Sequence, residues 1–158
     1  MREHLRGPAL LVAGLVATTA LTGCGGSEPD EEKAAAHGFS QAADLSTCSA
    51  DATATDAPYG DGFPEGWPFP PRTTVFHAED RGADGTIVTG ISTAPFEDVL
   101  AHMNGPVVDA GFTIEKGETE DHDAEAEWDG NGFRGRWAIR MSAQCPGETV
   151  VQVLSAPE

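Results

Sequence analysis

The sequence predicts an α+β domain in which about six strands form one antiparallel sheet and one helix packs on a face, in the order ββαββββ. Two observations lead to this prediction. Short runs rich in β-branched and aromatic residues recur between residues 73 and 154, and Gly- or Asp-rich turns separate them. Between the second and third runs lies one segment whose apolar residues follow the period of a helix.

The first two strands are expected at 73–79 (TTVFHAE) and 86–92 (TIVTGIS), with a turn over 81–85 between them. β-branched residues dominate both arms of this predicted hairpin. The helix follows, with Thr93 as its expected N-cap and Gly105-Pro106 as the place where it kinks or ends. Its apolar side chains share one face: Phe96, Val99, Leu100 and Met103.

The remaining strands are expected at 112–115, 124–128, 133–141 and 149–154. In the two middle strands, an apolar face with Trp128 and Trp137 alternates with a face of glutamates or arginines. If Trp128 faces Phe133 across the turn, each glutamate lies opposite an arginine. A register shifted by two residues keeps the same faces, so this pairing is a preference.

Residues 59–72 (YGDGFPEGWPFPPR) alternate aromatic residues with proline and glycine. The prolines exclude a helix and a central strand. We expect this stretch to lie extended across the edge of the domain, with Trp67 or Phe69 in the core. The alternative is an exposed, proline-rich recognition segment.

The N-terminus has the pattern of a secretory leader, in which a short, weakly basic start precedes the apolar run 9–23. Polar residues follow before the run reaches the ~20 apolar residues of a membrane-spanning helix. The run ends in Leu21-Thr22-Gly23-Cys24, and all four positions resemble the lipobox of bacterial lipoproteins. The resemblance implies that residues 1–23 are removed and that Cys24 carries a diacylglyceryl anchor. We therefore expect the protein on the outer face of the cytoplasmic membrane.

Residues 24–58 are rich in small and acidic residues, and Phe39 and Leu45 are their only large apolar side chains. Such a composition does not bury enough surface to offset the entropy of ordering, so it predicts a disordered tether. The folded domain is then expected at 59–158. Without residues 1–23 the chain holds seven basic and 25 acidic side chains, a net charge of −18 (7 − 25). This charge argues against a nucleic-acid partner and leaves membrane attachment to the lipid on Cys24.

Cys48 and Cys145 are the two cysteines that remain, and an oxidising compartment favours a disulfide between them. This bond would close a loop of about 97 residues, which the chain-entropy model values at ~4–5 kcal/mol. The alternative is two free or separately buried thiols. No C-x₂-C pair with further metal ligands is present in the sequence, so no metal site is predicted.

The segment 63–155 resembles small lipoproteins of high-GC Gram-positive bacteria, of the actinobacterial type. The resemblance rests on the aromatic-proline approach, on VLAHM followed by DAGF, and on WDGNGFRGRW followed by a cysteine. It implies a lipoprotein, and it supplies no catalytic residue.

Two further motifs favour structure over chemistry. The segment 130–135 (GNGFRG) matches G-x-G-x-x-G, but a strand pattern follows it where a dinucleotide fold requires a helix. The acidic run 115–129 holds the carboxylates that Ca²⁺ prefers, but it lacks the glycine of an EF-hand loop. We interpret it as a solvated loop and strand face.

These patterns predict a lipid-anchored, extracytoplasmic binding or interaction module that is non-catalytic and needs no cofactor. The histidines show no metal-binding or triad spacing, and no G-x-S-x-G motif accompanies them. The alternative is a lipoprotein that binds a cation or a small ligand at the acidic edge 115–129.

The anchor leads to a first prediction. Cys24→Ser removes the thiol that would receive the lipid, so the variant should lose its fatty-acid label and leave the membrane fraction. Metabolic labelling with a fatty-acid probe measures this, and an equally labelled variant would disprove the assignment of Cys24.

Overall fold

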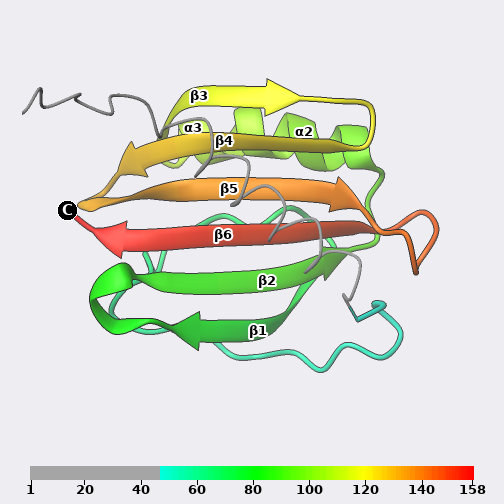
Figure 1. The fold of residues 1–158 in the computed structure, drawn as a ribbon, viewed down its shortest axis with the longest axis horizontal. Helices are drawn as coiled ribbons and strands as arrows, with labels where there is room; N and C mark the ends of the chain where they lie inside the picture. Colours follow the sequence, from blue (N-terminus) through cyan, green and yellow to red (C-terminus); the bar gives the residue numbers. More distant parts are fainter. Residues whose placement is uncertain (1–46) are drawn as a thin grey trace, which may run out of the picture.

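The structure, a computed structural model, describes residues 47–158 (Figure 1). The predicted leader, Cys24 and the first part of the predicted tether lie outside the described residues. Within residues 47–158, no helix has the length and apolar character needed to cross a bilayer.

One six-stranded antiparallel sheet forms the body of the domain, in the strand order β1-β2-β6-β5-β4-β3. Both helices lie on the same side of it (Figure 1). The α+β prediction of six strands with helical cover on one face is therefore confirmed. The elements are β1 (Thr73–Asp80), η1 (Gly82–Asp84), β2 (Thr86–Ser92), α2 (Phe96–Asn104), α3 (Pro106–Asp109), β3 (Thr113–Thr119), β4 (Asp123–Gly130), β5 (Phe133–Met141) and β6 (Thr149–Pro157).

The core lies on the inner face of the sheet, the face that the helices cover. Residues opposite one another in the ladders share this face, as in the row of Val88, Val153, Trp137 and Ala126. Trp137 and Val153 are at most 2% exposed. Gly135 keeps the sheet close to Trp128, because a Cβ at this position would lie 3.0 Å from the indole Cζ2 and would clash with the Leu154 carbonyl.

Helices α2 and α3 cover one part of the inner face, and residues 59–72 cover the rest. We call residues 59–72 the aromatic coil. Its Phe63 and Trp67 are 3% and 6% exposed. The ring of Trp67 lies 4.8 Å from that of Phe112 and 4.5 Å from that of Trp128. The prolines exclude regular structure as expected, but the coil lies across the core where we had expected it at the edge of the domain.

The start of the helix differs from the sequence prediction. Helix α2 begins at Phe96 with Pro95 as its N-cap residue, and Thr93 lies outside it. The Thr93 amide donates to the Arg72 carbonyl, and the Ala94 amide donates to the Ser92 hydroxyl. These bonds fix the approach to the helix, so the cap assignment to Thr93 was wrong.

The predicted break at Gly105-Pro106 is present, because α2 ends at Asn104 and α3 begins at Pro106. Helix α3 ends at Asp109 with Ala110 as its C-cap residue, and the next residue, Gly111, has a φ of 94° in the left-handed region. The Gly111 amide bonds the Val108 carbonyl and the Phe112 amide bonds the Val107 carbonyl, the two bonds of a Schellman motif. This ending directs Phe112 into the core.

The register of β4 and β5 also differs from the preferred prediction. Trp128 pairs with Gly135, and Gly130 pairs with Phe133, which is the alternative shifted by two residues. Asn131 and Gly132 form a two-residue loop with φ values of 56° and 81°. An Asn-Gly pair suits such a turn because both residues tolerate positive φ. The turn chemistry therefore decided between two registers that the alternation of faces could not distinguish.

Residues 47–56, which we call the strap, lie against the outer face of the sheet. Ala52 packs on the buried residues Ile91 and Val150, and the Thr55 amide donates to the carbonyl of Val75 on the edge strand β1. The folded region therefore begins before residue 59, where we had placed its boundary. The amino-acid composition did not predict an ordered strap, because backbone hydrogen bonds and one disulfide hold this segment, and large apolar side chains do not.

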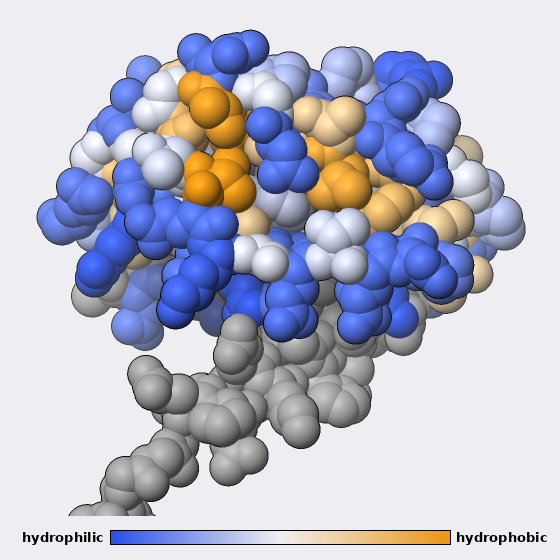
Figure 2. All heavy atoms as spheres, turned by 90° about the horizontal axis from the view of Figure 1, so that it is seen from above, coloured by the Kyte–Doolittle hydropathy of each residue, from blue (hydrophilic) through white to orange (hydrophobic). Residues whose placement is uncertain are grey.

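The opposite edge of the sheet is β3, whose side chains are exposed except for half-buried Ile114. Its charged residues and a register shift after Ile114 protect it against pairing with another strand. Seen from this side, the apolar surface is divided into separate patches by hydrophilic residues (Figure 2). Val108 is one of the large apolar side chains that are exposed, at 45%.

The inner face leads to a stability prediction. Trp137→Ala should lower the free energy of unfolding by about 3–5 kcal/mol, because it leaves a large cavity in a single small core. Arg134→Ala, on the exposed outer face of the same strand, should cost only about 0–1 kcal/mol. Urea melts measure both values, and equal midpoints for the two variants would show that the tryptophan face is not the core.

Candidate functional site

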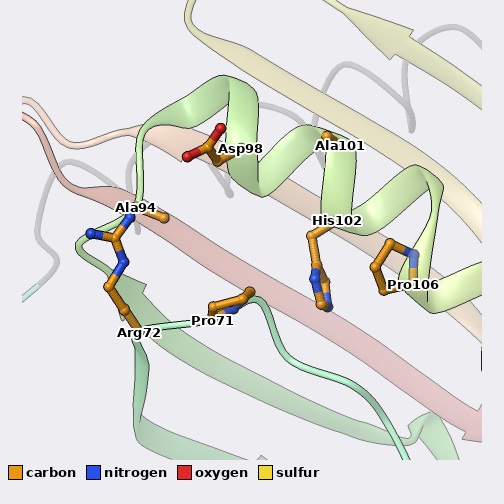
Figure 3. Close-up of a pocket in the computed structure, with 7 residues that line it drawn as sticks. All are labelled: Pro71, Arg72, Ala94, Asp98, Ala101, His102 and Pro106. Carbon is orange, nitrogen blue, oxygen red and sulfur yellow. The ribbon is translucent and has the colours of Figure 1, made fainter.

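A groove opens where helix α2 meets the end of the aromatic coil (Figure 3). It has a volume of about 370 Å³. We call it the α2 groove, and the residues that line it are Pro71, Arg72, Ala94, Asp98, Ala101, His102 and Pro106. The size is at the lower end of the range for small-ligand sites, which is about 300–1,000 Å³.

Hydrogen bonds join the two walls of the α2 groove. The Nε2 atom of His102 lies 2.9 Å from the Pro68 carbonyl and connects α2 to the coil. At the other end, the Ser92 hydroxyl donates to the Pro71 carbonyl over 3.2 Å. The hydroxyl of Thr149 on β6 donates to the carbonyl of Ala94, one of the lining residues. The walls are therefore fixed by bonds that do not use the exposed side chains of Arg72 and Asp98.

Arg72 has an unusual backbone conformation, with a φ of 62°. A side chain other than glycine, asparagine or aspartate is uncommon there, and the strain costs on the order of 1 kcal/mol or more. The Arg72 carbonyl accepts the Thr93 amide at 3.2 Å, which holds this conformation. In this conformation the guanidinium of Arg72 lies at the mouth of the groove, beside Ala94 (Figure 3).

The α2 groove is amphipathic. Proline and alanine side chains make its apolar surface, and its polar groups are one guanidinium, one carboxylate and one imidazole. Arg72 and Asp98 lie toward the end where α2 begins, and the His102 ring points into the space between helix and coil (Figure 3). Within residues 47–158, the side chains of Arg72 and Asp98 form no hydrogen bond or ion pair, and only their backbone groups are bonded.

Sequence reasoning did not find this groove. Arg72 is about thirty residues from His102 in the chain, and only the packing of coil against helix brings them together. The i, i+4 spacing of Asp98 and His102 on an amphipathic helix was the available signal, because it places both residues on one face.

The acidic run 115–129, our alternative site, has a different arrangement. Asp123, Glu125, Glu127 and Asp129 lie on the outer face of β4, opposite β5. Arg136 forms an ion pair with Glu125, and an Arg140 nitrogen lies 3.9 Å from the Asp123 carboxylate. Arginines thus contact two of these four carboxylates, which supports the interpretation as a solvated strand face.

A cavity of about 470 Å³ lies at the β3–β4 hairpin, lined by Glu120, Asp121, His122, Asp123 and Arg140. The guanidinium of Arg140 would oppose a cation bound there. Across residues 47–158, ligand atoms of three His, Cys, Asp or Glu residues converge within 4.8 Å only at Cys48, Cys145 and Glu148. The hairpin cavity is not such a cluster.

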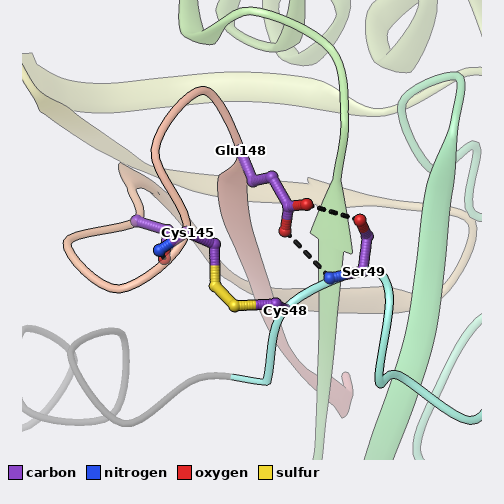
Figure 4. The surroundings of a disulfide bond; sticks show 5 residues. Cys48, Ser49, Cys145 and Glu148 are labelled. Atoms are coloured by element: carbon purple, nitrogen blue, oxygen red, sulfur yellow. Dashed lines mark hydrogen bonds between the residues drawn. A yellow bond between two sulfur atoms is a disulfide. The ribbon is translucent and has the colours of Figure 1, made fainter.

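That convergence is explained by a covalent bond. Cys48 and Cys145 form a disulfide with a Cα–Cα distance of 5.6 Å, so the predicted pairing is present and the sulfurs are not thiolate ligands. The carboxylate of Glu148 accepts hydrogen bonds from the Ser49 amide, at 2.9 Å, and from its hydroxyl (Figure 4). The disulfide and this carboxylate together fasten the strap to the loop between β5 and β6.

Comparison with known proteins identified no relative: no family model, no curated protein and no solved structure matches this chain.

The fastening of the strap leads to a further prediction. Replacing Cys48 and Cys145 together by alanine should lower the free energy of unfolding by about 3–5 kcal/mol, because a long loop is no longer closed in the unfolded chain. Ser49→Ala, which removes one hydroxyl bond at the same place, should cost only about 0.5–1.5 kcal/mol. Chemical denaturation measures both. An unchanged stability of the double variant would show that the strap is dispensable to the fold.

Proposed function

We propose that this protein is a lipid-anchored, extracytoplasmic binding module, and that the α2 groove is its ligand-binding site. The lipobox at residues 21–24 supports the anchor. The observation that carries the assignment of the groove is the pair of charged residues, Arg72 and Asp98, that line it and whose side chains have no hydrogen-bond or ion-pair partner among the described residues. Groups that the fold does not use are the ones available to a ligand.

A non-catalytic role is supported by the chemistry of the lining. The residues that line the α2 groove include no hydroxyl, thiol or amine nucleophile, so Asp98 and His102 are the only lining groups that could take part in covalent or proton-transfer chemistry. His102 is the residue most suited to proton transfer, but its Nε2 atom is engaged with the Pro68 carbonyl. Binding therefore accounts for these residues with fewer assumptions than catalysis.

The lipid anchor and the groove have complementary roles in this proposal. The anchor would keep the protein at the membrane, while the strong negative charge opposes adsorption of the domain to anionic headgroups. The domain would then remain accessible to ligands in the extracytoplasmic space.

A fragment screen by NMR tests the site. The protein is the mature chain, residues 24–158, carrying Cys24→Ser so that it stays soluble. Small amphiphilic fragments should shift the amide signals of α2 and of Phe69 and Arg72 in the coil, while the signals of the outer face stay in place. Ala101→Trp, which fills the groove, should remove these shifts.

Ala54→Trp is the matched control, because it adds the same side chain at an exposed position of the strap. It should leave the shifts intact. Fragment shifts confined to other surfaces, or shifts that survive Ala101→Trp, would contradict the assignment of the groove.

A further inference from the structure

We propose that the ligand of the α2 groove is a small zwitterion, an α-amino acid with an apolar side chain, whose carboxylate binds Arg72 and whose ammonium binds Asp98. This inference rests on the proposed function of the groove and specifies the chemical class of its ligand.

Arg72 and Asp98 differ from most other charged pairs of the domain in their ion pairing. Elsewhere in residues 47–158, Arg81 and Arg136 each pair with a glutamate and Arg140 lies within reach of Asp123, whereas Arg134 is exposed on β5 and forms no ion pair. Arg72 and Asp98 line one cavity and form no ion pair with each other. A ligand that brings one charge of each sign can therefore satisfy both side chains at once.

The two charges lie at one end of the groove, and its apolar surface extends away from them. Arg72 and Asp98 lie at the end of the groove where α2 begins, and His102 and Pro106 lie farther along it (Figure 3). A ligand held by its charged end at Arg72 and Asp98 would place its remaining atoms over Ala101 and toward Pro106. An apolar side chain suits these contacts because they exclude water from aliphatic carbon.

The net charge of the protein also favours a zwitterion over a simple ion. With a net charge of −17 over the full chain, the protein repels a simple anion, so Arg72 alone would be a poor anion site. A simple cation would find many exposed carboxylates elsewhere and would gain little selectivity from Asp98. A zwitterion carries no net charge, so the protein does not repel it and the other exposed carboxylates do not compete for it. Its selection depends on having Arg72 and Asp98 together in one groove.

Titrations with L-leucine and two analogues test this inference, with NMR shifts of α2 amides as the readout. N-acetyl-L-leucine lacks the ammonium and L-leucinamide lacks the carboxylate. Because both protein charges are exposed to solvent, we expect L-leucine to bind with a Kd on the order of 1 mM. Each analogue should bind about three- to tenfold more weakly.

Two variants assign the charges. Asp98→Asn should weaken L-leucine binding, and the variant should bind L-leucine no more tightly than N-acetyl-L-leucine. Arg72→Gly should abolish the advantage over L-leucinamide, and it should fold well because glycine suits the φ of 62°.

Matched controls are available in the chain. Glu97→Gln removes the neighbouring carboxylate in the same first turn of α2, outside the groove lining. Arg81→Gln removes an exposed arginine that pairs with Glu79. Both variants should keep the affinity and the ranking of the three probes.

Each outcome has a distinct meaning. If L-leucine leaves the α2 amides unmoved, or if the analogues bind as well as L-leucine, the zwitterion proposal is wrong. If fragments still bind the groove although L-leucine does not, the groove remains a ligand-binding site and only the zwitterion proposal fails. If neither fragments nor L-leucine bind there, both proposals fail. Equal losses in Asp98→Asn and Glu97→Gln would also overturn the assignment of Asp98.

Discussion

The fold depends on burying the apolar inner face of the six-stranded sheet, which is covered partly by helices and partly by the aromatic coil. Helices α2 and α3 are too short to cover the inner face alone, and the aromatic coil supplies the remaining apolar surface. Trp67 is central to this arrangement because its ring contacts both Phe112 and Trp128. Its burial fixes a segment that has no helix or strand of its own.

The α2 groove follows from the same constraint. A helix and a proline-rich coil have different surface shapes, so they do not close completely where they meet, and a space remains between α2 and residues 68–72. The bond from His102 to the Pro68 carbonyl joins the walls at one point without filling the space. On the opposite face of the sheet, the strap and its disulfide complete the domain independently of the groove.

The sequence allowed most of the fold to be predicted and little of the candidate site. Alternation of apolar and charged residues located the strands, and the Gly105-Pro106 pair located the break after α2. The register of β4 and β5 was ambiguous, because a shift of two residues preserves every face, and the Asn131-Gly132 turn decided it. The α2 groove joins residues that are distant in sequence, and the left-handed conformation of Arg72 has no sequence signal.

On this account, the aromatic coil is an integral part of the core and forms one fixed wall of the groove. Hydrogen exchange of the Thr93 amide tests this claim most directly. This amide donates to the Arg72 carbonyl at the junction of coil and sheet. If coil and helix form one cooperative unit, Thr93 should be about as strongly protected as the central amides of α2, with both opening at the free energy of global unfolding. Fast exchange at Thr93 with α2 still protected would show that the coil opens by itself, and it would contradict the account of a preformed groove.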